Sequence, residues 1–304
     1  MMGSTAPWAV RRSSRPLAAW LFAVLATAST GGWAQSGPGW GLLLDTAVVY
    51  DSNITRAKTP SDQLQDSAFT ANLSKNHVIG LGPTSRLVLA GVLGGERFQT
   101  YNKLSHLDLG LEAEWQYRES SDFSAPTLGV FAKYKLEDNE SDVRDGQRLS
   151  LGLSLTQPLT DRITLFAALS NNQRFATSKV FSTNDTAVRF NLDYALSARK
   201  TLYLGGEYRN GDVVSTGRAS LENVTISKVF VQDDAFSGGQ FFSYKVEGAT
   251  WLTTVGYNQA LGPRQAIDFS WRHVESTPSL RPSWATSARS YVTDQVFATY
   301  LLRF

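Results

Sequence analysis

The sequence predicts an all-β protein, a closed antiparallel transmembrane β-barrel of about twelve strands. Three observations predict this fold. Segments of about ten residues alternate between apolar and polar residues, the connections between them are alternately short and long, and the last segment ends on an aromatic residue, Phe304. An alternation with a period of two places apolar and polar side chains on opposite faces of a strand, as a barrel in lipid requires.

Residues 1–34 are predicted to form an export signal, which leaves residues 35–304 as the barrel domain. An apolar stretch at 17–28 precedes Gly32-Trp33-Ala34, which offers small residues at the two positions that a signal peptidase inspects. Three arginines form the basic region before it: Arg11, Arg12 and Arg15. The apolar stretch is too short for a membrane-spanning helix of roughly 20 residues, so we expect a cleavable signal.

The composition excludes several classes of function. The chain has no cysteine, which excludes disulfides, thiolate metal sites and a cysteine nucleophile. The formal net charge is +2, and acidic and basic residues are interleaved rather than grouped in blocks. We therefore expect no nucleic acid partner and no cofactor.

The alternation predicts which charged side chains face the interior. Between residues 107 and 118, for example, Leu109 and Leu111 alternate with Asp108 and Glu112. A charge on the lipid face near the middle of the bilayer costs roughly 2–4 kcal/mol, so the charged face must be the inner one. The predicted lumen-lining residues are Asp108, Glu112, Glu114, Arg118, Lys133, Lys135, Arg189, Asp193, Glu207, Arg209, Asp268 and Arg272, and Glu137 lies on the same face.

The connections alternate in length in the way that separates periplasmic turns from external loops. Short connections are predicted at 81–84, 120–126, 159–162, 198–200 and 261–264, and longer ones at 51–65, 99–106, 138–147, 175–186, 215–239 and 276–289. This pattern joins about twelve strands and places both chain ends on the side of the short turns.

One long connection, 215–239, leaves an alternative open. It contains β-prone pieces at 224–226 and 229–231, so it is either a loop folded inward or an extra pair of strands that would give about fourteen. We favour about twelve strands because the segment 240–259 shows no internal break. Aromatic side chains near the strand ends predict two interfacial girdles, with Tyr50 and Tyr291 toward the external rim.

Two clusters were considered for catalysis and metal binding. His273-Val274-Glu275-Ser276 holds a histidine beside a serine, but neighbours in a strand point to opposite faces, so no catalytic residue is predicted. Asp138, Glu140, Asp142 and Asp145 are spaced like a calcium-binding loop. Because Val143 occupies the position that needs glycine, we predict a solvated acidic loop and no metal site.

The chain resembles a proteobacterial outer-membrane β-barrel. Residues 48–57, VVYDSNITRA, are similar to the opening strand of uncharacterised, porin-like barrel families. They are more weakly similar to the barrel domain of surface lipoprotein assembly modifiers, whose N-terminal helical repeat domain this chain has no room for. The closing strand resembles the sorting signature of such barrels, with Tyr300, Leu302 and Phe304 as the signal. The resemblance implies location in the bacterial outer membrane, assembly by the barrel-assembly machinery, and contact with lipid and lipopolysaccharide.

Two functions follow as hypotheses. The interior charges either line a polar path that selects small solutes or form ion pairs that fill and stiffen the barrel. Eight strands are filled by side chains and sixteen leave an aqueous channel, and about twelve lies between. The leading hypothesis is a porin-like passive channel for small hydrophilic solutes through a mixed-charge lumen. The alternative is a non-conducting structural or interaction barrel, or an accessory component of an export or surface-assembly system.

Overall fold

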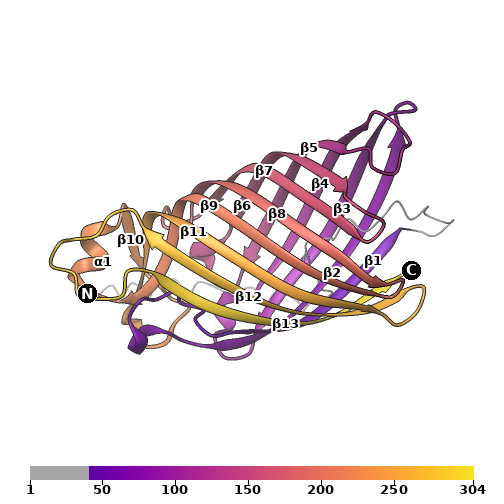
Figure 1. The fold of residues 1–304 in the computed structure, drawn as a ribbon. Helices are drawn as coiled ribbons and strands as arrows, with labels where there is room; N and C mark the ends of the chain where they lie inside the picture. The colour runs from indigo at the N-terminus through magenta and orange to yellow at the C-terminus, as the bar shows by residue number, and fades with distance from the viewer. Residues whose placement is uncertain (1–40) are drawn as a thin grey trace, which may run out of the picture.

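The computed structural model of the protein describes residues 41–304, which form a closed β-barrel seen from the side in Figure 1. The predicted export signal lies outside the described residues. The strands are β1 (Leu42–Asp51), β2 (Asp66–Gly80), β3 (Ser85–Phe98), β4 (His106–Arg118), β5 (Thr127–Asn139), β6 (Gly146–Pro158), β7 (Ile163–Ala176), β8 (Thr183–Ser197), β9 (Lys200–Arg218), β10 (Val229–Gln232), β11 (Phe241–Ala260), β12 (Gln265–Pro278) and β13 (Tyr291–Arg303). Short helical elements are α1 (Leu221–Ile226) and the 3₁₀ turns η1 (Pro60–Asp62), η2 (Asn102–Leu104), η3 (Asp142–Arg144) and η4 (Ser237–Gly239).

Among the described residues, twelve strands close the barrel and one more, β10, pairs with the part of β11 that extends beyond the ring. Within the ring each strand pairs antiparallel with the strands next to it in the chain, except that β9 pairs with β11 because β10 lies outside the ring. The ring closes where β1 pairs with β13, from Leu43 opposite Arg303 to Asp51 opposite Gln295. This confirms the predicted all-β barrel. Closure leaves no open edge, which a sheet in lipid cannot tolerate because its backbone polar groups have no water to bond.

The two ends of the barrel differ as the connection lengths predict. The short turns and the C-terminus lie at one end, whereas α1 and β10 lie at the other (Figure 1). We refer to these as the short-turn end and the loop end. Among residues 41–304, no helix reaches the length and apolar character needed to cross a bilayer.

The connection between β9 and β11 combines elements that the sequence pattern offered as alternatives. Its β-prone piece at 229–231 is a strand, β10, which pairs with β11 from Val229 opposite Lys245 to Gln232 opposite Phe242. The piece at 224–226 is instead helical and belongs to α1. Two local contacts override its β-branched residues: the Ser220 hydroxyl accepts the Asn223 N–H, and Ile226 is buried at the end of the turn.

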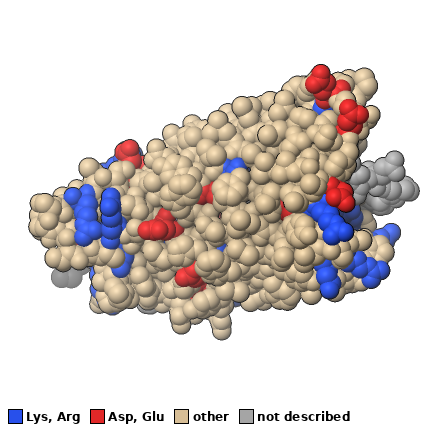
Figure 2. Space-filling view, viewed as in Figure 1, with Lys and Arg blue, Asp and Glu red and all other residues tan. Residues whose placement is uncertain are grey.

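Apolar side chains cover the outside of the barrel. On the face shown in Figure 2, charged side chains gather mostly toward the two ends and the middle is largely uncharged. Exposed apolar side chains on the strands include Val48, Leu109, Leu111, Leu128, Val130, Leu151, Leu153, Leu169, Val188, Leu204, Val255, Phe269 and Val296. Their burial in a bilayer would remove a large apolar surface from water, which is the main favourable term for such a fold.

One aromatic residue lies elsewhere than predicted. Tyr50 is exposed on the outer face, as expected of a girdle residue. Tyr291 is 2% exposed and packs with Ile226 and Val246 instead of facing lipid. Because β13 begins at Tyr291, this side chain takes the inward phase of the strand and lies under α1. The sequence shows that Tyr291 lies close to the end of a strand, but it does not show whether its side chain faces lipid or the interior.

A pair of glycines marks the point where β9 and β11 leave the barrel wall. Gly211 lies opposite Gly248 in the register, and both flanking strands stop there, with Asp185 of β8 opposite Gly211 and Pro278 of β12 opposite Gly248. Gly211 has φ 151°, which L side chains rarely adopt. Beyond this pair the two strands continue as a ribbon toward the loop end.

Replacing Gly248 by alanine is expected to destabilise the barrel. A Cβ there would lie 2.6 Å from the backbone oxygen of Thr277, so the strand backbones must separate. We expect the free energy of unfolding to fall by about 1–3 kcal/mol, measured by urea unfolding with heat-modifiable gel mobility as the readout. The matched control is Gly91→Ala on β3, where an added Cβ meets nothing within 4 Å. Equal stability of the two variants would contradict this account of the ribbon.

Candidate functional site

The predicted charged residues lie on the strand face opposite the exposed apolar side chains. On β4, for instance, Leu109 and Leu111 are exposed while Asp108 between Leu107 and Leu109 is buried. The same alternation holds on β5, β8, β9 and β12. In a closed barrel this face is the interior wall, and the candidate site is therefore the lumen together with its entrance at the loop end.

On β4 and β5, two lysines each pair with one carboxylate. Lys133 Nζ lies 2.8 Å from a Glu112 oxygen, and Lys135 Nζ lies 3.1 Å from Asp108 Oδ2. Asp108 can pack flat on the wall because the facing residue on β3 is Gly94, where a Cβ would lie 1.9 Å from Asp108 Oδ1. These pairs join strands that are neighbours in the wall and do not cross the lumen.

Two further predicted residues of β4 serve the wall and the short-turn end. Glu114 accepts hydrogen bonds from Ser154 Oγ at 2.6 Å and Gln116 Nε2 at 2.8 Å. Arg118 donates to the backbone oxygen of Phe123 at 3.3 Å, which ties it to the turn between β4 and β5. The structure thus places Arg118 at the rim of the barrel, away from the middle of the wall.

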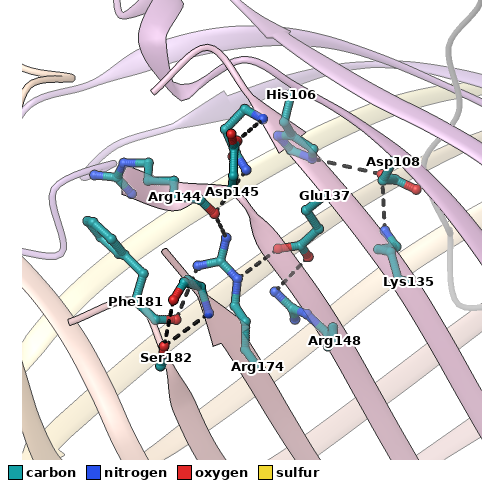
Figure 3. A network of polar contacts seen from close by, with 12 residues as sticks. His106, Asp108, Lys135, Glu137, Arg144, Asp145, Arg148, Arg174, Phe181 and Ser182 are labelled. Carbon is teal, nitrogen blue, oxygen red and sulfur yellow. Dashed lines mark hydrogen bonds and ion pairs between the residues drawn. The ribbon is translucent and has the colours of Figure 1, made fainter. Parts of the chain in front are cut away.

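A second polar network links β5, β6 and β7 toward the loop end (Figure 3). Glu137 accepts from two arginines, at 2.7 Å from Arg174 Nε and 3.2 Å from Arg148 Nη2. Arg174 Nη2 also donates to the backbone oxygen of Arg144 at 2.8 Å, which connects the wall to the loop after β5. Arg148 and Arg174 are absent from the predicted set. Leu149, Leu151 and Leu153 share one face of their strand, so Arg148 belongs to the opposite, interior face. This alternation could have identified Arg148 as an interior residue.

On β8, β9 and β12 three arginines surround one carboxylate. Glu207 accepts from Arg189 Nε at 2.9 Å and from Arg209 Nε on its own strand. Arg272 lies 5.0 Å from the ring centre of Phe297, with Nε 3.4 Å from Thr254 Oγ1.

The two remaining predicted acids bond to neutral groups. Asp193 accepts from Asn191 at 2.6 Å, and Asp268 accepts the Tyr203 hydroxyl at 2.8 Å. The twelve predicted residues are therefore not one connected network. They form separate groups on the β4–β5 side and on the β8–β12 side of the wall.

Solvent reaches the basic side chains of this wall. The side chains of Lys133, Arg148, Arg189 and Arg209 are 43%, 44%, 39% and 37% exposed. Their partners are less exposed, with Glu112 at 21%, Glu137 at 9% and Glu207 at 11%. The carboxylates thus lie against the strands, and the cationic ends project into the solvent-accessible lumen.

The loop end is covered by a structure that we call the cap, consisting of residues 212–247. It comprises the ribbon of β9 and β11 beyond the glycine pair, α1, β10 and the segments between them. Asp233 is fully buried within the cap. Its Oδ2 accepts from Ser243 Oγ at 2.6 Å and forms an ion pair with Arg144 in the loop between β5 and β6.

The cap reaches the opposite side of the barrel. Asp234 is bonded to Lys103 Nζ at 2.8 Å and to Ser141 Oγ at 2.5 Å. Phe236 is 3% exposed and packs with Tyr101 at 5.2 Å between ring centres. Residues 101–103 follow β3, which lies across the ring of strands from β9 and β11. The segment from Asp233 to Phe241 therefore spans the mouth.

The loop between β1 and β2 joins the cap from a third side. The backbone oxygen of Thr55 accepts the Thr216 N–H at 2.7 Å, and Asp62 forms an ion pair with Arg218 at 3.1 Å. Lys58 is 5% exposed at its side chain and pairs with Glu222 of α1. Glu222 also accepts from Ser287 Oγ in the loop between β12 and β13, at 2.7 Å. The alternative of an extra strand pair in 215–239 is therefore wrong for the described residues, because only 229–232 add a strand, β10, while 221–226 are helical and 233–239 cross the mouth.

The electrostatics of the cap follow from burial and pairing. Burial lowers the pKa of Arg144, and the adjacent Asp233 partly offsets this effect. For Asp234, burial raises the pKa, but the hydrogen bonds from Lys103 and Ser141 outweigh it and leave the pKa below its usual range. For Glu222 the same balance, with Lys58 and Ser287 as donors, also leaves a lowered pKa. Both carboxylates are therefore held in their charged forms.

The clusters considered for chemistry have structural partners. His273 Nδ1 lies 2.9 Å from Asp294 Oδ1 on the outer face, whereas Ser276 bonds to Thr250 at 2.8 Å on the inner face. In the acidic loop, Asp145 accepts the Asn139 N–H at 2.6 Å. Among residues 41–304, no three His, Asp or Glu side chains are grouped so that they could hold a metal ion.

The predicted sorting residues of the C-terminal strand share its outer phase. Tyr300 and Phe304 are exposed, and Leu302 lies opposite Leu44 of β1 and Gln265 of β12. Phe304 N–H donates to the Leu42 backbone oxygen at 3.0 Å, so the terminal residue is tied to the first strand. These three residues thus lie at the seam where the barrel closes.

No protein-family model matches this chain, and no curated protein matches it. Its fold is similar to that of an outer membrane channel from Pseudomonas putida F1, with 11% identity, a TM-score of 0.51, and 87% of this chain and 96% of that chain covered. The KdgM porin in complex with disordered oligogalacturonate has 11% identity and a TM-score of 0.43, with 86% of this chain and 99% of that chain covered. The NanC porin has 8% identity and a TM-score of 0.45 over the same shares. The likeness to the Pseudomonas putida channel shows that the chain has the fold of an outer-membrane β-barrel channel, as its sequence predicted.

The substitution Asp233→Asn is expected to loosen the cap. It leaves Arg144 without its carboxylate partner, and a hydrogen bond to a charged group contributes about 1.5–3 kcal/mol. We expect amide hydrogen exchange in residues 233–241 to become about 10- to 100-fold faster, with the strands unchanged. Asp142→Asn, an exposed acid in the loop that holds Arg144, is the matched control. Unchanged protection of 233–241 in Asp233→Asn would contradict the proposed anchoring.

Acid is also expected to loosen the cap. Because the folded pKa values of Asp234 and Glu222 are lowered, their contribution to stability is present above the ordinary carboxyl pKa of about 4 and is lost as the pH falls through the lower folded values. Hydrogen exchange of 221–241, corrected for intrinsic rates, should be constant from about pH 8 to 5 and faster below about pH 4. Residues 87–93 of β3 are the internal control. Equal loss of protection there would mean that acid unfolds the barrel rather than the cap.

Proposed function

We propose that this protein is an outer-membrane channel through which small hydrophilic solutes pass passively along a mixed-charge lumen. The described residues form a closed twelve-stranded barrel with an apolar exterior, and such a barrel suits the outer membrane. The polar interior wall offers hydrogen-bonding and charged groups to a solute that has left bulk water. No catalytic step is included in this proposal.

The observation that carries the proposal is the solvent exposure of the interior cations. If ion pairs filled the barrel, the lysine and arginine ends would be buried against the opposite wall. Instead, Lys133 and Arg189 are each about two-fifths exposed, and their partners come from adjacent strands. This exposure favours a water-filled lumen over a packed one.

The cap favours the second candidate, a barrel that does not conduct. Residues 233–241 are anchored across the mouth by Arg144 and Lys103, and solutes must pass beside the cap or displace it. A barrel held shut in this way would suit a structural or interaction protein, or an accessory component of an export or surface-assembly system. The two candidates differ in one measurable property, conductance.

The proposal includes the route by which the protein reaches the membrane. The predicted cleavable signal would direct export, and Tyr300, Leu302 and Phe304 would present the closing strand to the barrel-assembly machinery. The exposed apolar belt would then contact lipid, and the charged loop end would meet lipopolysaccharide.

Purified protein in a planar lipid bilayer tests the proposal. We expect stepwise conductance from folded wild-type protein, and larger or longer openings from Asp233→Asn because that variant loosens the cap. Folding of each sample is verified by heat-modifiable gel mobility, and Asp142→Asn is again the control. Absence of conductance steps from both folded wild type and folded Asp233→Asn would exclude the channel and favour the non-conducting barrel.

A further inference from the structure

The three arginines on β8, β9 and β12 are an excess of positive charge in the interior wall. Arg189 and Arg209 share the single carboxylate of Glu207. Arg272 has an aromatic ring and a threonine hydroxyl as contacts, and its electrostatic neighbours include Arg189 and Arg209 as well as Glu207. Three guanidinium groups around one carboxylate leave a formal charge of +2.

Nearby carboxylates do not neutralise this charge. Asp193 and Asp268 bond to Asn191 and Tyr203, and in the described part of the chain neither forms an ion pair with the three arginines. Across the barrel the situation differs, since Lys133 and Lys135 each have one acidic partner. Arg148 and Arg174 share Glu137 nearer the loop end, so the excess there is one charge, against two around Glu207.

The free donors of Arg189 and Arg209 can reach a solute. Arg189 and Arg209 are more than one-third exposed, whereas Glu207 is 11% exposed and lies against the strands. Each guanidinium has five N–H donors, and the recorded ion pairs use Nε of Arg189 and Arg209. Their terminal nitrogens have no hydrogen-bond partner among the described residues, so they can bind planar oxyanions in a bidentate manner.

We propose that Arg189, Arg209 and Arg272 form a binding site in the lumen for a small solute that bears carboxylate or phosphate groups. The proposal deepens the channel function and rests on it, because such a solute would be selected on its way through the lumen. Arg272 supplies the guanidinium that has no carboxylate partner, while Glu207 holds the other two in place. Neutral and cationic solutes gain nothing from this site.

Titration calorimetry on the folded protein in detergent at low salt tests the site, with citrate and inorganic phosphate as probes. We expect Arg272→Gln to weaken binding of the preferred probe at least about tenfold, the loss expected for one charge-assisted contact. This variant leaves no acid unpaired, because no ion pair of Arg272 is recorded among the described residues. Lys133→Gln removes the same charge from the opposite wall and should weaken binding less than about threefold.

The arms of the experiment separate the outcomes. Tighter binding of citrate would assign carboxylates to the site, and tighter binding of phosphate would assign phosphates, provided that Arg272→Gln weakens it. No heat with either probe, no effect of Arg272→Gln, or an equal effect of Lys133→Gln would overturn the site. Binding in detergent does not require conduction. A protein that binds citrate through Arg272 but never conducts would therefore refute the channel and retain the site.

Discussion

The structure depends on one constraint, which is that every backbone N–H and C=O within lipid must find a partner in the protein. The pairing of β1 with β13 and of β9 with β11 satisfies it for the twelve wall strands of the described chain. Closure then decides the chemistry of each face. One phase of every strand faces lipid and must be apolar, and the other is free to carry charge. The charged lumen is thus a consequence of closure as well as a candidate for function.

The cap is built on a different principle. Beyond Gly211 and Gly248, the ribbon has lost its neighbours in the wall, so side chains from several loops must supply its contacts. Asp233 and Asp234 supply them through short polar bonds to Arg144 and Lys103, and Phe236 adds apolar packing. These are side-chain contacts, and they are not part of the backbone hydrogen bonds that join the wall strands. The cap is therefore the part of the protein whose stability can change while the barrel stays folded.

In the interior wall, ion pairs form between adjacent strands and therefore do not block the lumen. Ion pairs such as Lys133 with Glu112 run along the wall, because adjacent strands lie close enough for direct contact. Glycines such as Gly94 let acidic side chains lie flat, which leaves the longer basic side chains to project. Where arginines outnumber acids, as around Glu207, the wall acquires a net charge on one side. Charge selectivity would then arise from local composition and not from the net charge of the chain.

The sequence by itself determined an all-β barrel of about twelve strands, the alternation of connections and the face of the predicted charges, because a period of two and the cost of charge in lipid act within single strands. It did not show that Arg148 and Arg174 share Glu137, that 221–226 is helical, or that Tyr291 is buried. Only the tertiary structure decided that Asp233 meets Arg144, 89 residues away in the chain. Such contacts depend on how loops from opposite sides of a closed ring converge, and no local pattern encodes that distance.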